Sequence, residues 1–100
     1  MKKIIELISD EMKNAFEQAG YARELGKVTL SNRPDLCEYQ CNGAMAGAKQ
    51  YKKAPIMIAG DVAAKLADSK VFERAEAVAP GFLNLILRKE FVGEYIRDMR

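Results

Sequence analysis

The chain has 100 residues, a mass of 11.2 kDa and 49% hydrophobic residues, which is the size and composition of one folded domain and too apolar for a disordered segment. Its net charge of +2 produces too weak a field to indicate a nucleic-acid or membrane partner by itself, so such a partner must be argued from local patches. Because the sequence contains no histidine, Ser/His/Asp and Cys/His catalytic systems and His-ligated zinc sites are excluded. As a separate expectation, we predict no catalytic residue and no metal site in these residues.

The first predicted element is an amphipathic helix from Lys2 to Ala19, in which apolar residues recur at spacings of three and four. Gly20 comes directly after this helix and is predicted to end it, because glycine readily takes the left-handed conformation found at helix ends. Val28 to Ser31 alternates apolar and polar residues, which predicts a short strand, and Asn32 to Asp35 has the composition of a turn. A second strand is predicted from Leu36 to Gln40.

Two helices are predicted next. Asn42 precedes Gly43 to Lys53, a segment whose small residues let another backbone approach closely and whose far end is basic. Pro55 suits the first turn of another helix, because its missing N–H would be unpaired there, and an apolar face continues from it to Leu66.

Two strands are predicted after these helices. Ser69 to Ala79 alternates between two mixed faces, with Phe72 and Arg74 expected on the same face. The Pro80-Gly81 pair breaks this run and is too short for a crossover, so the next strand should pair with it in antiparallel orientation. That strand, Phe82 to Leu87, is apolar on both faces apart from one asparagine, as is typical of a central strand.

A final helix is predicted from Lys89, with an apolar face along its length. The element order places the chain in the α+β class, and we expect a small antiparallel sheet of three to four strands packed against helices. We see no linker or repeat within residues 1–100, which predicts one domain.

Cysteine usage and hydropathy predict a cytoplasmic protein. Cys37 and Cys41 are four positions apart, which is neither the spacing of a redox pair nor half of a four-cysteine zinc framework, and reduced thiols are the simplest interpretation. The stretch from Ile4 to Ile8 is interrupted by Glu6, so no signal peptide is expected. No run approaches the roughly 18 to 20 apolar residues of a membrane span, and we expect no membrane partner.

Two stretches have a more specific residue pattern than packing alone requires: Glu38 to Ala46 (EYQCNGAMA) and Ala79 to Leu85 (APGFLNL). Their order, their spacing, and Lys49 and Pro55 between them resemble the N-terminal additional domain of arginyl-tRNA synthetases, over essentially the whole chain. The resemblance implies an α+β module that precedes a class I catalytic domain and holds the D-loop side of the elbow of the cognate tRNA. We interpret the second stretch as a bend that fills the core, with Asn84 satisfying backbone groups.

The resemblance implies a tRNA-binding role for Tyr39, Gln40 and Asn42, which match the family pattern. Cys37 and Glu38 depart from its usual glycine and aspartate, so no role that needs those residues is carried over. Proteins read RNA loops by stacking bases on aromatic rings and by hydrogen-bonding base edges with amides. One ring and two amides within four positions would suit that task.

Lys49, Lys52 and Lys53 follow on the next predicted helix and are expected to meet phosphates, which adds affinity without sequence preference. Each of these assignments has a structural alternative. Asn42 would serve as a helix cap, Tyr39 as a half-buried strand aromatic, and the lysines as a solvated face.

The leading prediction is therefore a tRNA-binding domain without catalytic motifs or cofactor of its own. Its parent enzyme would ligate arginine to tRNA(Arg) with ATP and magnesium, and the catalytic and anticodon-binding domains would lie outside these residues. One alternative is a free-standing protein-interaction or general RNA-binding module, docking through a face made by Leu83, Leu85 and Leu87 or through the last helix. A thiol redox enzyme using Cys37 and Cys41 is a third hypothesis, against which their spacing argues. DNA is not an expected partner.

Overall fold

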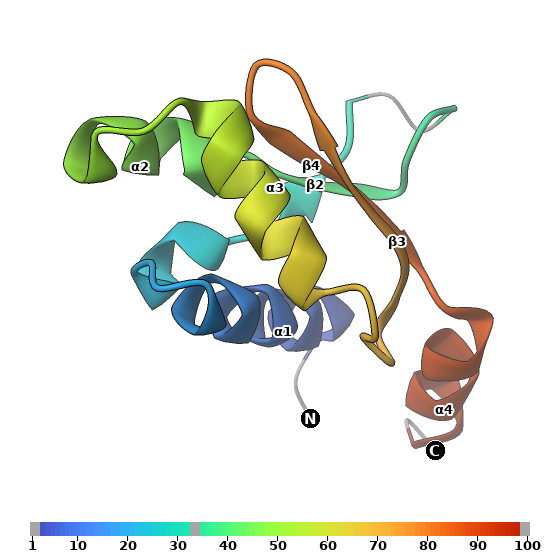
Figure 1. Ribbon diagram of the computed structural model, residues 1–100. Coiled ribbons are helices and arrows are strands. Elements are labelled where there is room, and N and C mark those ends of the chain that lie inside the picture. The colour runs from blue at the N-terminus through green and yellow to red at the C-terminus, as the bar shows by residue number, and fades with distance from the viewer. Residues whose placement is uncertain (1–2, 33–34, 99–100) are drawn as a thin grey trace.

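The structure, a computed structural model, describes residues 3–32 and 35–98. These ranges contain nine elements (Figure 1): α1 (Ile4–Gln18), the 3-10 helix η1 (Arg23–Gly26), β1 (Thr29–Leu30), β2 (Tyr39–Cys41), α2 (Gly43–Tyr51), α3 (Pro55–Lys65), β3 (Phe72–Val78), β4 (Phe82–Leu87) and α4 (Lys89–Asp98). The predicted order of α-helices and strands is confirmed, and η1 is an additional element that the sequence did not predict. Lys2 in the first predicted helix, and Arg33 and Pro34 in the predicted turn, lie outside the described residues.

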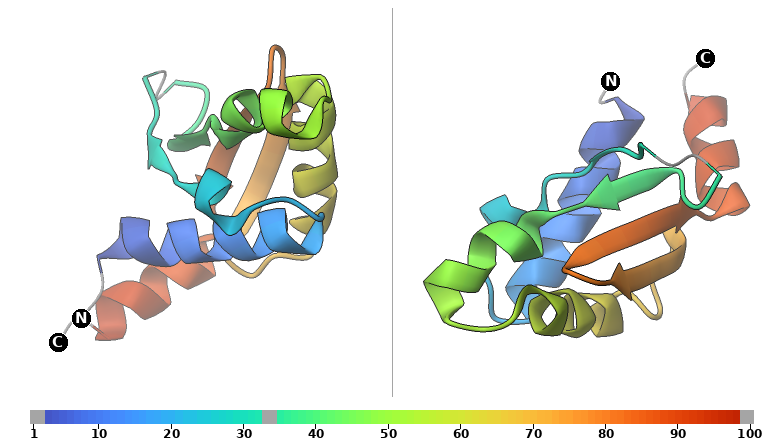
Figure 2. Two further views of the ribbon diagram at one scale, coloured as in Figure 1. Left: turned by 90° about the vertical axis from the view of Figure 1, so that its left-hand side faces the viewer. Right: turned by 90° about the horizontal axis from the view of Figure 1, so that it is seen from above.

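The four strands form one antiparallel sheet in the order β1-β2-β4-β3, which confirms the α+β class and the antiparallel pairing across Pro80-Gly81. Helices α1, α2 and α3 lie on one face of this sheet (Figure 2) and leave the other face open. Side chains of β4 alternate between the two sides. Leu83, Leu85 and Leu87 are buried under the helices, so they cannot form a docking face as the interaction-module hypothesis supposed.

Strand β2 begins later than predicted. Asp35 and Leu36 lie in a turn and Glu38 in a bend. Pairing with β4 begins where the Glu38 backbone N–H donates to the Leu85 carbonyl over 3.0 Å. The carboxylate of Glu38 also accepts a 2.8 Å hydrogen bond from the Leu87 N–H. Tertiary pairing with β4, which local periodicity does not report, decides where β2 starts.

The prediction that Phe72 and Arg74 share a face is wrong. The register of β3 against β4 shifts between these two residues, so that Phe72 lies opposite Leu87 and Arg74 opposite Ile86. One extra residue in a strand inverts the alternation of side chains beyond it. Phe72 is therefore buried beneath the helices, whereas Arg74 is exposed on the open face.

The hydrophobic core lies between the open sheet and the helices α1 and α3. The largest fully buried side chains are Ile8, Met12, Phe16, Cys41, Ile58, Val62, Phe72, Leu83 and Leu85. Helix α1 ends as predicted, because Gly20 takes a φ of +93° and the next N–H, of Tyr21, donates back to the Phe16 carbonyl over 2.8 Å.

Close backbone approaches explain the glycines of the two recognisable stretches. A Cβ added to Gly43 would lie 1.7 Å from the carbonyl oxygen of Leu25 in η1, and one added to Gly81 would lie 2.4 Å from the Cβ of Pro55 at the start of α3. The predicted close approach at the start of α2 is confirmed. These two contacts connect the ends of β2 and β3 to the helical layer.

Helix α4 is an appendage to this core. None of its described residues is fully buried, although Phe91 and Val92 pack against the edge of the core, and Ile96 is 60% exposed. In Figure 1 it projects beyond the sheet, away from α2 and the start of α3. Within the described ranges, no helix combines the length and hydropathy that a membrane span requires.

Candidate nucleic-acid interface

Side chains of β2 alternate between the two faces of the sheet, so the Tyr39 ring and the Gln40 amide, which were both predicted to contact RNA, lie on opposite faces. Tyr39 lies opposite Leu85 and packs half-buried against the core, on the helix-covered side of the sheet. Gln40 lies opposite Asn84 and faces the other side. The geometry therefore favours the packing alternative for Tyr39, because its ring and the amide of Gln40 point away from each other.

Gln40 and Asn84 form a pair on the open face. The Nε2 of Gln40 donates a 3.0 Å hydrogen bond to the Oδ1 of Asn84. The prediction that Asn84 satisfies backbone groups is therefore wrong, since its partner is a side chain from the neighbouring strand. Among the described residues, the Nδ2 of Asn84 and the Oε1 of Gln40 make no further hydrogen bond, which leaves one donor group and one acceptor for an external partner.

Phe82 joins this pair at the same end of the sheet. It lies two residues before Asn84 on β4 and so shares the open face, where it is half-buried. Cys41 lies opposite Leu83, and the residues beyond this pair, Asn42 and Phe82, consequently lie at one end of the two strands. Sequence reasoning missed Phe82 because it assigned that stretch to the core. The alternation within the stretch, with Phe82 and Asn84 on one face, was the available signal.

Asn42 occupies the predicted N-cap position of α2 but does not act as a cap through its side chain. Its backbone has a φ of −113° and a ψ of 17°, and the side chain makes no capping hydrogen bond. The exposed amide is thus available to a ligand. Lys49 and Lys52 follow at spacings of about two and three helical turns, on the exposed side of α2 together with Met45.

Lys53 differs from the two other lysines in having partners within its own domain, although its side chain is also 46% exposed. Its Nζ donates a 3.1 Å hydrogen bond to the Tyr21 hydroxyl, lies 4.0 Å from the Asp61 carboxylate and is 5.3 Å from the centre of the Tyr21 ring. The side chains of Lys49 and Lys52 make no hydrogen bond or ion pair with another described residue. The structure therefore divides the predicted phosphate-binding lysines into one anchored and two available side chains.

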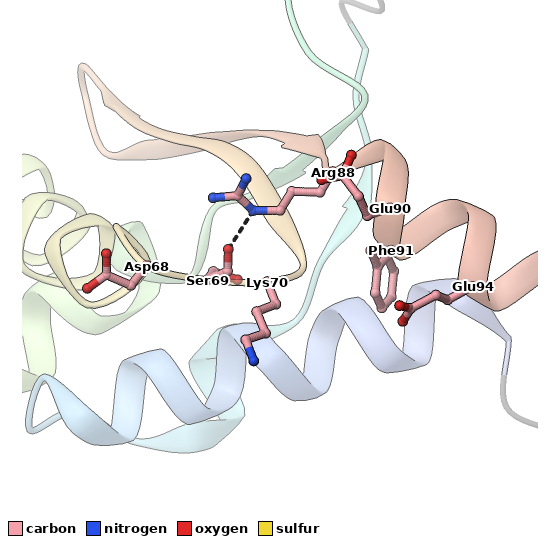
Figure 3. A pocket seen from close by; sticks show the side chains of 7 residues that line it. All are labelled: Asp68, Ser69, Lys70, Arg88, Glu90, Phe91 and Glu94. Atoms are coloured by element: carbon pink, nitrogen blue, oxygen red, sulfur yellow. Dashed lines mark hydrogen bonds between the residues drawn. The ribbon is translucent and has the colours of Figure 1, made fainter.

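Two hollows of the described surface suit a polyanion less well. One, of about 370 Å³, lies between the link from α3 to β3 and helix α4 (Figure 3), where the Nε of Arg88 donates to the Ser69 carbonyl over 2.7 Å. The other, of about 450 Å³, lies between α1 and the segment around η1. Acidic side chains outnumber basic ones in both, by three to two: Asp68, Glu90 and Glu94 against Lys70 and Arg88 in the first, and Glu6, Asp10 and Glu24 against Lys13 and Lys27 in the second.

Cys37 and Cys41 are buried and form no disulfide bond. Burial raises the pKa of the Cys41 thiol to about 11, so it is neutral at physiological pH and a poor nucleophile. The Cys37 thiol is held in a 3.2 Å hydrogen bond to the Ser31 hydroxyl. This arrangement argues against thiol redox chemistry. Nor do three or more potential metal ligands gather anywhere in residues 3–32 and 35–98.

The fold and these side chains define a small α+β domain whose sheet is covered by helices on one face and presents paired amides and an aromatic ring on the other, with two available lysines at the far end of the covering helix α2. A family model described as the arginyl tRNA synthetase N terminal domain matches residues 2–87. The chain belongs to this family, which confirms the resemblance inferred from the sequence.

Curated relatives are much longer than this chain. It is 58% identical over 100 residues to an arginine–tRNA ligase of Agathobacter rectalis and 44% identical over 99 residues to one of Alkaliphilus oremlandii. These matches cover 100% and 99% of the chain but 17% of each relative, so the chain spans about a sixth of their length.

Solved structures show the same fold. The arginyl-tRNA synthetase of Plasmodium falciparum superposes with a TM-score of 0.74 at 20% identity, over 94% of this chain and 18% of its own. That of Thermus thermophilus gives a TM-score of 0.72 at 23% identity, over 93% of this chain and 15% of its own.

Proposed function

We propose that this domain binds tRNA(Arg) on the D-loop side of its elbow, as part of an arginine–tRNA ligase. The observation that carries the proposal is the family match over residues 2–87 together with relatives that are arginine–tRNA ligases and extend far beyond the matched region. The catalytic and anticodon-binding domains of that enzyme would join arginine to the tRNA with ATP and magnesium in the cytoplasm. This domain would supply affinity and orientation, and no chemical step.

The open face at one end of the sheet is the surface we assign to the RNA bases. Phe82 offers an aromatic ring, while Gln40 and Asn84 are oriented by their mutual hydrogen bond and each keep hydrogen-bonding capacity. Unpaired RNA bases are recognised by such a combination of stacking and edge contacts. Asn42 lies at the same end of the strands and adds a third amide. Tyr39 supports this surface from the core side of β2.

Lys49 and Lys52, at the C-terminal end of α2, form a separate basic surface that would meet phosphates. Both are exposed and make no ion pair with the described residues, so each positive charge is available to the RNA backbone. Such contacts add affinity for any RNA, while the amides and the ring discriminate between sequences. Lys53 completes the predicted set, but its ammonium group is paired with Tyr21 and Asp61 of the same domain.

Binding of the 100-residue chain to a labelled tRNA(Arg) transcript tests this function. We expect binding that is tighter than to an unrelated tRNA, and expect replacement of the D-loop nucleotides to remove that preference. Equal affinity for tRNA(Arg), the unrelated tRNA and the tRNA(Arg) with replaced D-loop nucleotides would favour the alternative of a general RNA-binding module. No measurable binding, with the fold verified by circular dichroism, would contradict an RNA-binding role and favour a protein-interaction module.

A further inference from the structure

The three lysines at the end of α2 differ in their surroundings although they lie within five positions of one another. Lys53 contacts two side chains from other elements: Tyr21, in the link after α1, and Asp61, on α3. Lys49 and Lys52 contact neither of these side chains, although all three lysines are exposed. This corner of the molecule therefore carries three positive charges, one of which faces a carboxylate of its own domain.

The partner of Lys53 is a fixed group. Tyr21 is 6% exposed, and its hydroxyl donates a 2.6 Å hydrogen bond to the Asp61 carboxylate. The ring of Tyr51 packs edge-on against Tyr21, with 4.9 Å between ring centres, and the Tyr51 hydroxyl accepts a 2.8 Å hydrogen bond from the Ala22 N–H. The hydroxyl that receives Lys53 thus has little freedom to move.

Lys53 remains charged in this position. The hydrogen bond to Tyr21 raises the pKa of its ammonium group, and the nearby Asp61 carboxylate acts in the same direction. The proximity of that carboxylate offsets much of the positive field of Lys53 outside the domain. A phosphate approaching this corner would therefore meet the fields of Lys49 and Lys52 more strongly than that of Lys53.

The backbone places Lys52 apart from its neighbour. Lys52 takes the left-handed conformation, with a φ of 54°, at the end of α2, and the Lys53 N–H donates back to the Ala48 carbonyl over 3.2 Å. Only three residues, 52–54, link α2 to α3. Anchoring Lys53 to Tyr21 and Asp61 therefore holds the whole turn, and with it the direction in which Lys52 leaves the surface.

We propose that Asp61 and Tyr21 withhold Lys53 from RNA and position Lys52, so that the phosphate contacts of this turn come from Lys49 and Lys52 alone. This inference rests on the proposed RNA-binding function. Asp61 is then a positioning residue that also sets specificity. By limiting the number of sequence-blind phosphate contacts, it increases the share of the binding free energy that depends on base contacts.

A matched series of Lys49→Ala, Lys52→Ala and Lys53→Ala tests which of the three lysines contact phosphates. The measured quantity is the slope of log Kd against log salt concentration for tRNA(Arg), which reports the number of phosphate contacts. We expect Lys49→Ala and Lys52→Ala each to lower this slope by about 0.7 to 0.9, and Lys53→Ala to lower it by much less. If Lys53→Ala lowers the slope as much as Lys52→Ala, the inference is wrong.

This series also separates the inference from the function on which it rests. If no lysine replacement changes the slope while tRNA(Arg) still binds, the lysine end of α2 is not the phosphate surface, and this part of the proposed function fails. If all three replacements lower the slope equally, the surface stands and only the special role of Lys53 is lost.

Asp61→Asn, with Asp61→Glu as its control, tests the withholding directly. Removing the carboxylate charge should free Lys53, tighten binding to tRNA(Arg) and to an unrelated tRNA alike by about five- to tenfold at 0.1 M salt, and steepen the slope by about 0.7 to 0.9. Asp61→Glu should resemble the original chain.

A purely structural role of Asp61 would change the stability of the domain without steepening the slope, and that result would overturn the inference. If Asp61→Asn does not fold, Tyr21→Phe, which removes the bridging hydroxyl, must steepen the slope instead.

Discussion

The side-chain amide of Gln40 donates a 3.0 Å hydrogen bond to the Oδ1 of Asn84, which lies directly opposite it on the adjacent strand. The two residues belong to the two recognisable stretches of the sequence, which are otherwise far apart along the chain. Their pairing explains why both stretches carry an amide at this register. It also restricts the rotation of each amide before any ligand arrives.

Breaking this pair should produce coupled effects on tRNA binding. We expect Gln40→Ala and Asn84→Ala each to weaken binding to tRNA(Arg) more than to an unrelated tRNA, and the double variant to lose less than the sum, by about 0.5 to 3 kcal/mol, because each amide orients the other. Equilibrium titrations of the four proteins complete the cycle. Strict additivity, or equal losses for both RNAs, would contradict a shared role in base recognition.

Phe82 and Tyr39 should differ in what their replacement damages. Phe82→Ala removes the ring from the open face and should weaken tRNA(Arg) binding by about 1 to 3 kcal/mol, the usual contribution of a base stack. Tyr39→Ala removes a ring packed against the core and should chiefly lower the free energy of unfolding. Binding and urea denaturation, measured on both variants, separate the two roles. Loss of binding in a folded Tyr39→Ala variant, with Phe82→Ala unaffected, would restore Tyr39 as the stacking residue.

Gly43 and Gly60 offer a comparison of two glycines in helices. Gly43→Ala should lower the free energy of unfolding by about 3 kcal/mol or more, since its Cβ would lie 1.7 Å from the Leu25 carbonyl oxygen and force η1 away from α2. Gly60→Ala meets nothing within 4 Å inside α3 and should stabilise the domain by about 0.5 to 1 kcal/mol. Thermal unfolding of the two variants tests this contrast. An unchanged midpoint for Gly43→Ala would mean that η1 does not lie against α2 in solution.

Cys41 should make the domain sensitive to alkaline pH. Burial raises the pKa of its thiol from 9.0 to about 11, so between these values the unfolded chain releases a proton that the folded chain retains. The unfolded state then binds fewer protons, and stability falls as the pH rises from 9 to 11, by about 2 to 3 kcal/mol from this group. Urea denaturation across this range should show a steeper decline for the original chain than for Cys41→Ala. Parallel declines would contradict an ionisable thiol in the core.

Much of the fold was predictable because helices and strands have local signatures. The period of α1, the glycine that ends it and the proline that begins α3 each appear within a few residues of sequence. The short Pro80-Gly81 connection implied the antiparallel pairing of β3 and β4. Exposure of Lys49 and Lys52 was likewise expected of lysines at a helix end.

The sequence by itself determined the class of the domain, the order of its elements and the two stretches that carry its family resemblance, because these depend on local periodicity and turn chemistry. Only the tertiary structure decided which face each functional side chain takes. The extra residue near Arg74 inverts a strand, the alternation of β2 turns Gln40 away from Tyr39, and Lys53 finds its partner, Tyr21, 32 positions away in the chain. Such pairings depend on register and on contacts between distant segments, which a local pattern of hydrophobic and polar residues does not specify.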